Sequence, residues 1–408
     1  MFANLKSLFS NKNLMKLWIS DTISTSGDYV FLVALVWLAW VLYASPFVIG
    51  IIFAARTVPV IVMSPYTGIL SDKYNKKIMI VMGNLSQGIV LLVFFIFYWS
   101  GILSITSFVL FIVLLYSFKP FVDVPESAIL PELVKKEQIK QSNALFSTTS
   151  ASNRIIGMGI GGVIIGLFGF GIPISYDFVS FFLALIIMSR VKYKPVNVAA
   201  KDTIKPSETV EIEKLNFRVL KTPLISIIII ALFFNIISSG FNPLVAPFVS
   251  ELGGDSIIYG WFLGIMALGA LLVSVFMTRR RVEYTRDKKD RHEFLYSLTI
   301  LFFSLLVMVL FNKIAIFFPI FFILGASETL FNVNFQTLIQ TNTPIEKLGR
   351  MFGIITTILR GLQPISALSF TYIATEFGIK SSILVLTVIA LLVLTSYSII
   401  HTKQFIKR

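Results

Sequence analysis

The chain has 408 residues, of which 56% are hydrophobic and 14% are charged, and its formal net charge at pH 7 is +14. Soluble domains carry about 25% charged residues, so this composition excludes a soluble globular protein and indicates a lipid environment. The chain has no Cys and only two His. Disulfides, thiol catalysis and Cys metal sites are therefore excluded, and a His-cluster metal site or a serine-type catalytic triad is disfavoured.

Long apolar segments follow one another along the chain, separated by short polar breaks. Most reach the ~20 residues that an α-helix needs to cross the hydrocarbon core, and spanning helices tolerate the Pro and Gly that several contain. We therefore predict an all-α integral membrane protein with twelve transmembrane helices, called spans 1 to 12. Their ranges are 15–43, 46–71, 78–99, 104–130, 142–167, 172–190, 223–250, 256–278, 293–312, 314–338, 348–375 and 379–401. Span 1 is too long and too polar for a signal peptide.

Lys and Arg are concentrated on one side of the predicted membrane. Only Lys313 and Lys380 fall in loops of the opposite side, and four of the 35 basic residues lie inside spans. Because cytoplasmic loops carry the excess of Lys and Arg, this split predicts a multi-pass protein of the cell (inner or plasma) membrane with both termini in the cytoplasm. It also explains the positive net charge without nucleic acid as a partner.

The widest polar stretch divides the twelve spans into six plus six. We predict an N-terminal six-helix bundle over 1–190, a cytoplasmic linker over 191–222 and a C-terminal six-helix bundle over 223–408. The halves are weakly alike: the sequence Ser26-Gly27-Asp28 of span 1 takes the place that Ser239-Gly240-Phe241 takes in span 7. Two pseudo-symmetric bundles related by an axis along the membrane normal follow from this pattern.

The break after span 2 reads Gly68-Ile-Leu-Ser-Asp72-Lys73-Tyr-Asn-Lys76-Lys77. It resembles the signature loop G-x-x-x-D-[RK]-x-G-[RK]-[RK] of the major facilitator superfamily. Asn75 replaces the inner Gly, and it is expected to suit a tight turn because Asn tolerates the left-handed region.

Further stretches resemble the macrolide-efflux and enterobactin-exporter branch of that superfamily. They are Lys16-Leu17-Trp18 with Gly27-Asp28, Ala55-Arg56-Thr-Val-Pro59, Leu130-Pro131-Glu132-Leu-Val, Asn143-Ala144-Leu145, Asp177-Phe-Val-Ser180-Phe181, and Pro344 through Gly349-Arg350-Met-Phe-Gly353. The resemblance implies the major facilitator fold and alternating-access transport, usually outward and usually driven by proton influx. It implies no enzyme activity and no cofactor, with a small-molecule substrate and the bilayer as partners of a monomer.

The resemblance also implies a conformational role for the signature loop. Asp72 is expected to dock against the N-terminal end of span 11, around Gly349-Arg350, where a carboxylate satisfies free backbone N–H groups. Lys73, Lys76 and Lys77 are expected at the cytoplasmic surface. For the last two, the simple reading is positive-inside topology.

Ionisable side chains at membrane depth cost ~2.5–3.5 kcal/mol each, so each needs a partner, a wet cavity or a function. Asp28 lies near mid-bilayer in span 1, and Asp21, Thr25 and Asp28 share one helical face. Asp28 is either a carboxyl that titrates during transport or the structural partner of Arg56 on span 2; the two roles can coexist.

Two carboxylates of span 4 stand three residues apart and therefore face the same way. Asp123 and Glu126 are expected near the inner third of the span, with Arg154 on span 5 as counter-ion. Their alternatives are a substrate or proton site and a buried pair that joins spans 4 and 5. Lys119 is expected to snorkel or to join this network.

Glu328 on span 10 and Arg360 on span 11 lie at similar predicted depth and are interpreted as partners. Asp177 in span 6 is interpreted as structural. In span 5, Gly157-x3-Gly161 and Gly162-x3-Gly166 predict close approach of a neighbouring helix.

The leading functional hypothesis is proton-coupled efflux of small amphipathic, drug-like or macrolide-like molecules by a secondary transporter. A siderophore or metabolite carrier, working in export or import, is the alternative within transport. A scramblase or another membrane protein that does not transport substrates is the alternative outside it. The short loops contain no P-loop and no His/Asp constellation, which disfavours an enzyme.

Overall fold

The computed structural model describes residues 9–135, 138–193, 222–279, 288–342 and 345–406. All regular secondary structure in these ranges is helical. Ten of the described helical segments are long and apolar enough to cross a membrane, and Tyr296–Leu310 is a shorter apolar helix. With α14, a helix of 33 residues over Ile345–Phe377, these elements confirm the predicted all-α membrane fold.

The helix bounds follow the predicted spans closely. The N-terminal bundle contains α2 (Lys12–Tyr43), α3 (Pro46–Lys73), α4 (Lys76–Trp99), α5 (Ile105–Phe118), α6 (Pro120–Leu133), α7 (Ile139–Phe168) and α8 (Gly171–Ser189). The C-terminal bundle contains α9 (Thr222–Phe241), the 3₁₀ turn η4 (Asn242–Leu244), α10 (Val245–Glu251), α11 (Ser256–Arg279), α12 (Lys288–Leu310), α13 (Ile314–Asn342), α14 and α15 (Ile379–Ile406). The predicted linker falls mostly on 194–221, outside the described residues.

The fourth predicted span is confirmed as one apolar segment over Ile105–Leu133. It is assigned as two helices, α5 and α6, that join at Lys119, whose backbone is itself helical (φ −56°, ψ −43°). Pro120 has no N–H to donate to the preceding turn, so the helical hydrogen bonds are interrupted at one position, which we call the break. The Lys119 carbonyl accepts from the backbone N–H groups of Val122 (2.9 Å) and Asp123 (3.1 Å).

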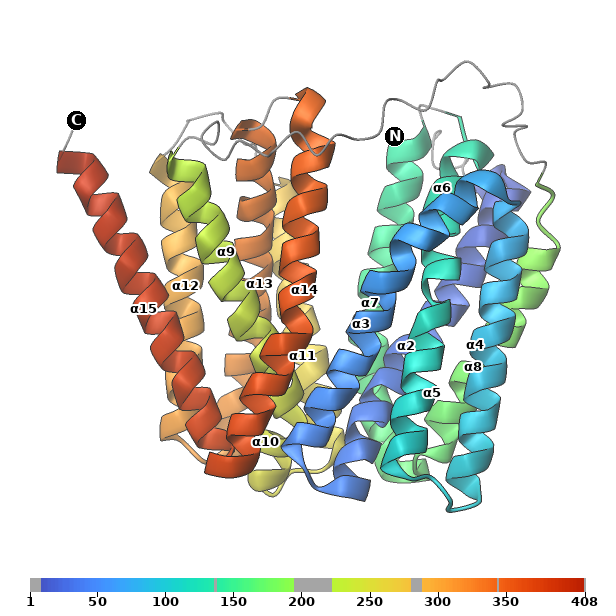
Figure 1. Cartoon of the computed structure of the whole chain (residues 1–408), viewed down its shortest axis with the longest axis horizontal. Coiled ribbons are helices and arrows are strands. Elements are labelled where there is room, and N and C mark those ends of the chain that lie inside the picture. Colours follow the sequence, from blue (N-terminus) through green and yellow to red (C-terminus); the bar gives the residue numbers. More distant parts are fainter. Residues whose placement is uncertain (1–8, 136–137, 194–221, 280–287, 343–344, 407–408) are drawn as a thin grey trace.

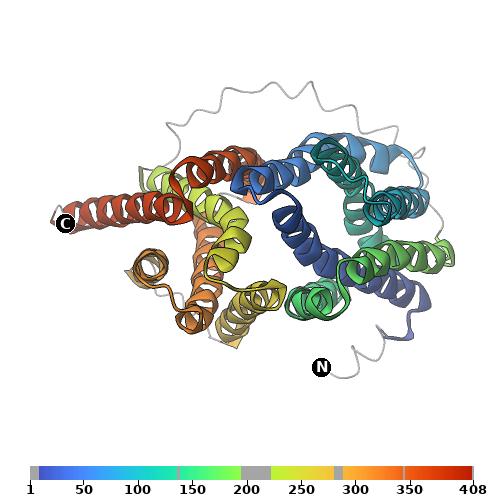
Figure 2. The ribbon, with the colours of Figure 1, turned by 90° about the horizontal axis from the view of Figure 1, so that it is seen from below.

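Each half packs as its own bundle. In the N-terminal bundle α2 packs on α7 and α8, and α4 packs on α6 and α8; in the C-terminal bundle α13 packs on α11 and α12, and α9 packs on α14 and α15. Figure 2 shows the two groups of helices side by side. This is the predicted two-bundle arrangement.

The signature loop is shaped by helix capping. Asn75 has an extended backbone (φ −67°, ψ 110°), and its side-chain oxygen accepts from the N–H groups of Lys77 (3.0 Å) and Ile78 (3.4 Å). The expected left-handed turn at Asn75 is therefore wrong. Asn is suitable here because it caps the N-terminus of α4, satisfying donors that the helix leaves free.

The two bundles contact each other near one end, where α3 begins and α7 ends; we call this the closed end (Figure 1). At the α3–α14 crossing, a Cβ on Gly50 would clash with Thr371, and the backbone N–H of Phe47 donates to Thr375 at 3.0 Å. At the α7–α11 crossing, a Cβ on Gly260 would lie 2.7 Å from the Cα of Gly162. The predicted close approach along α7 is confirmed.

The opposite end, where α2 begins and α8 and α15 end, is called the terminal end. Figure 1 shows the ribbons of α14 and α3 diverging toward it. Asp72, at the end of α3 on this side, is exposed. The bundles are therefore closed at one end and separated at the other.

Candidate functional site

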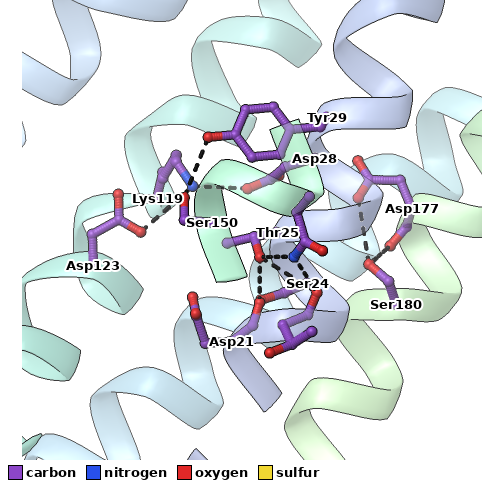
Figure 3. A network of polar contacts seen from close by, with 12 residues as sticks. Asp21, Ser24, Thr25, Asp28, Tyr29, Lys119, Asp123, Ser150, Asp177 and Ser180 are labelled. Atoms are coloured by element: carbon purple, nitrogen blue, oxygen red, sulfur yellow. Dashed lines mark hydrogen bonds and ion pairs between the residues drawn. The ribbon is translucent and has the colours of Figure 1, made fainter. Parts of the chain in front are cut away.

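Lys119, at the break between α5 and α6, holds the central ion pairs of the N-terminal bundle (Figure 3). Its Nζ lies 2.8 Å from Oδ2 of Asp28 on α2 and 3.5 Å from Oδ1 of Asp123 on α6. The expected Asp28–Arg56 pair is therefore wrong, and so is Arg154 as the counter-ion of Asp123.

More carboxylates than cations surround this lysine. Asp21 and Glu126 both lie within electrostatic reach of Lys119 and Asp123, and of each other. With Lys119, Asp28 and Asp123 they form what we call the Lys119 network. Asp177 also acts on Lys119, and Arg360 acts on Asp123. Carboxylates therefore outnumber cations here, so a proton or an added cation would be stabilised.

Hydroxyl and amide groups hold the polar face of α2 in place. Thr25 Oγ1 donates to the Asp21 carbonyl at 2.7 Å, and Asn153 of α7 donates to Thr25 Oγ1 at 2.8 Å and to the Thr22 carbonyl at 2.9 Å. Tyr29 of α2 and Ser150 of α7 are 3.5 Å apart. The predicted polar face of Asp21, Thr25 and Asp28 is confirmed, and it is oriented by α7.

Asp177 of α8 lies behind the same face of α2 and is fully buried. Its Oδ1 accepts from Ser180 at 3.4 Å, whereas its Oδ2 has no hydrogen-bond partner in the described part of the chain. Gly27 makes room for it, because a Cβ there would clash with both Asp177 and Ser180. The side chain packs between α2 and α8, away from the separated ends of the bundles.

Arg56 stacks on aromatic rings instead of a carboxylate. Its guanidinium carbon lies 4.9 Å from the ring centre of Tyr116 and 5.6 Å from that of Phe53. Its Nε is buried, with no hydrogen-bond partner among the described residues. Tyr116 also hydrogen-bonds to Arg56 through its side chain. Aromatic faces attract cations, but they supply no acceptor for the buried Nε.

The charges of the C-terminal bundle act across to the N-terminal bundle. Among the described residues Glu328 and Arg360 form no ion pair, so their expected partnership is wrong. The charge that acts on Glu328 is Arg154 of α7, and Arg360 acts on Asp123 of α6. Each of these electrostatic interactions therefore acts between the two bundles, although neither is an ion pair among the described residues.

Contacts with α11 place Arg154 and Glu328 at similar depth. The carbonyl of the residue after Arg154 would lie 3.5 Å from a Cβ on Gly264 of α11. Gly325, one turn before Glu328 on α13, meets α11 at Met266. Because Gly264 and Met266 are two residues apart on α11, the two charged residues lie beside the same part of α11, on its two sides.

The expected docking partner of the signature loop falls outside the described side chains. Asp72 and Lys73 are exposed, and the side chains around Gly349-Arg350 lie outside those that the structure describes. Lys76 pairs with Glu132 at 3.2 Å, and Tyr193 donates to the same carboxylate at 2.5 Å. Lys76 therefore does more than mark topology: it ties the start of α4 to the end of α6.

The remaining loop residues make no comparable contact. A Cβ on Gly68 would meet nothing within 4 Å, and Lys77 is half-buried and forms no ion pair with another described residue.

The sequence pattern gave too little weight to Asp21 and to the central position of Lys119. The available signal was Pro120, which directly follows the lysine inside an apolar segment.

Two bundles, an interior network of charges and contacts at one end define a carrier of the major facilitator fold. The chain matches the family described as "Transmembrane secretion effector" over residues 5–405. It belongs to that family of major facilitator transporters.

Named relatives share this length. The chain is 26% identical to the uncharacterized MFS-type transporter YfiS of Bacillus subtilis, covering 98% of this chain and 97% of the relative. It is 21% identical to the staphyloferrin A transporter of Staphylococcus aureus (93% and 94%) and 24% identical to the multidrug resistance protein MdtG of Escherichia coli (74% and 72%). A bacterial homologue of the iron transporter ferroportin, solved in an inward-facing state, has the same fold (TM-score 0.74, 14% identity, 94% and 97% covered).

Proposed function

We propose that this transporter is a proton-coupled secondary exporter of small amphipathic molecules and that it works by alternating access. The observation that carries the proposal is the Lys119 network, in which two carboxylates are ion-paired to one ammonium and two more lie within electrostatic reach of it. The relative named as a multidrug resistance protein supports a drug-like substrate class. The carrier has no enzymatic step and needs no cofactor; its energy source is the proton gradient.

Proton coupling requires a carboxylate that exchanges its partner during the cycle. Asp28 is ion-paired to Lys119, and Asp123 competes for the same ammonium from 3.5 Å. When a proton neutralises one carboxylate, Lys119 is free to pair with another, and the attraction between α2 and the α5–α6 break changes. The proton is thereby linked to helix position.

Access alternates by movement of one bundle against the other. With both termini in the cytoplasm, as the positive-inside pattern predicts, the separated terminal end opens to the cytoplasm and the closed end faces outward. Asp72 would then dock on the start of α14 in the opposite state. Its exposure on α3 is consistent with a contact that forms only in that state.

Purified protein in proteoliposomes tests the function. An imposed pH gradient should drive accumulation of members of a panel of fluorescent dyes, cationic drugs, macrolides and carboxylate-bearing amphiphiles. Collapse of the gradient with a protonophore should abolish it. Equal uptake with and without the gradient would exclude proton coupling, and no uptake of any amphiphile would exclude the substrate class.

Membrane orientation is tested separately, using the absence of native Cys. A Cys introduced at Lys205 or Lys288 should react with an impermeant thiol reagent only after the cells are opened. Labelling of intact cells would place these loops outside and reverse the assigned direction of transport.

A siderophore carrier is the second candidate, because one relative is named a staphyloferrin A transporter. The same proteoliposomes distinguish the two by including iron-chelating and iron-free organic acids in the panel. Gradient-driven transport of chelators alone would favour this candidate over drug efflux.

A further inference from the structure

Arg56 is a cation of the interior whose charge no carboxylate balances. Across the described ranges no carboxylate oxygen lies within ion-pair distance of its guanidinium. Asp28, its expected partner, is held at 2.8 Å by Lys119. An unbalanced guanidinium inside a membrane protein is unfavourable, so a charge that is absent from the protein itself is the simplest complement.

The surroundings of Arg56 come from both bundles and are aromatic. Phe53 of α3 and Tyr116 of α5 lie beside the guanidinium. Tyr259 of α11, in the other bundle, lies within electrostatic reach of Arg56 and stacks on Trp37 of α2, with ring centres 5.4 Å apart. Such a setting gives a ligand one charged contact and several apolar walls, which is the usual composition of a small-molecule site.

The position of Arg56 along α3 suits a ligand that enters from the terminal end. Gly50, where α3 crosses α14, lies six residues nearer the closed end, which is roughly 9 Å along the helix. Arg56 is therefore found just inside the inter-bundle contact, where an entering molecule would be stopped. The Nε atom already lies buried without a partner at this depth.

We propose that Arg56 binds the anionic group of the transported molecule, so that the substrate is an amphipathic organic acid. The inference rests on the proposed transport function and names its substrate class. A planar guanidinium binds a carboxylate through two parallel hydrogen bonds, and the apolar body of the acid would pack on Tyr116 and Phe53, with the buried Trp37–Tyr259 stack behind them. The Lys119 network then keeps its carboxylates for the proton.

The test uses three ligands that share one apolar body. Biphenyl-4-carboxylate, biphenyl-4-carboxamide and biphenyl-4-methylammonium are titrated by calorimetry into the purified full-length chain in lipid nanodiscs. The carboxylate should bind at least about tenfold more tightly than the amide, as expected for hydrogen bonds between charged groups. Arg56→Gln should reduce carboxylate affinity to that of the amide while leaving the amide unchanged.

Two further variants make the test decisive. Arg56→Lys keeps the positive charge but lacks the planar guanidinium that makes two parallel hydrogen bonds, so its preference for the carboxylate over the amide should be reduced by severalfold. This variant also provides the test if Arg56→Gln fails to fold. Arg154→Gln, which removes another interior guanidinium of the same bundle, should keep the full preference.

Each contrary result overturns the proposal. The first is that the unmodified chain binds the carboxylate no more tightly than the amide, or fails to bind the carboxylate at millimolar concentration. The second is that Arg56→Gln or Arg56→Lys keeps the full preference for the carboxylate over the amide. The third is that Arg154→Gln loses that preference as completely as Arg56→Gln. Binding needs no gradient, so failure of pH-driven transport would remove proton coupling and leave this result standing. Conversely, gradient-driven transport of the ammonium ligand alone would keep the function and remove the substrate class.

Discussion

The two bundles share one helical plan but have different interiors. In the N-terminal bundle, the space between α2, α6 and α7 holds the Lys119 network and a row of hydroxyl groups (Figure 3). In the C-terminal bundle the corresponding space is aromatic: Phe234 stacks on Phe331 with ring centres 3.8 Å apart, and Phe262 stacks on Phe321 at 4.4 Å. Duplicated architecture therefore does not imply duplicated chemistry.

The difference assigns separate tasks to the halves. A hydrophobic core centred on the C-terminal bundle extends across the interface to Val33, Trp37 and Met158 of the N-terminal bundle. Stacked rings resist rearrangement, because close-packed interiors transmit strain instead of absorbing it. The N-terminal bundle contains ionisable groups that can exchange ion-pair partners. The C-terminal bundle is a closely packed aromatic core, which we call the rigid wall, and the N-terminal bundle moves relative to it.

The largest expected effect comes from removing the rigid wall. Phe331→Ala should lower the free energy of unfolding by about 3 kcal/mol, because the ring is almost fully buried and leaves a cavity. Denaturant unfolding of the purified protein measures this, with the exposed Phe303→Ala as control at under about 1 kcal/mol. The pH dependence of transport should not change. A changed pH dependence would contradict the separation of tasks.

Removal of the ammonium of the charged network should have the next largest effect. Lys119→Met leaves four carboxylates without their shared cation and should cost about 2 kcal/mol of unfolding free energy. This is below the value for a fully buried pair, because the side chains of Lys119 and Asp28 are 27% and 25% exposed. Lys119→Arg should recover most of the loss, and adding Asp28→Asn to Lys119→Met should recover part. Strictly additive losses would show that the two residues are not coupled.

Neutralising Asp28 should separate transport from its energy source. One pH unit supplies about 1.4 kcal/mol per proton, or roughly tenfold accumulation. Asp28→Asn should reduce that accumulation to none while permitting exchange of substrate across the membrane. Uptake and counterflow in proteoliposomes measure the two activities. Full gradient-driven accumulation by Asp28→Asn would transfer the coupling role to Asp21, Asp123 or Glu126.

The smallest effect concerns the charges that link the bundles. Arg154→Gln and Glu328→Gln should show a coupling energy of about 1 kcal/mol in a double-mutant cycle of thermal stability. Arg360→Gln combined with Glu328→Gln is the matched control and should be additive, because those two residues are not paired. Coupling in the control and none in the test pair would restore a partnership within the C-terminal bundle.

The sequence predicted those features of the fold that depend on amino-acid composition and on the helical spacing of residues. Helix bounds, the two bundles, the polar face of α2 and the close packing of α7 all follow from patterns within one segment. Ion partners did not follow, because they depend on the rotation and depth of separate helices. Asp28 pairs with Lys119 of α5–α6 instead of Arg56 of α3, and the sequence contains no direct signal of that choice. Glu328 acts on Arg154 across the bundles, and no local signal reports that relation.

The crossing of Gly162 and Gly260 has a mechanical consequence. Backbone rests on backbone there, with no side chain to interlock, so the contact can serve as a fulcrum. Along α7, the lever arm from Gly162 to Ile139 is about 35 Å at 1.5 Å per residue. A tilt of about 10° would thus sweep the start of α7 through about 6 Å while the fulcrum itself barely slips. A small change of ion-pair partners near the Gly162–Gly260 crossing would therefore produce a much larger displacement at the start of α7.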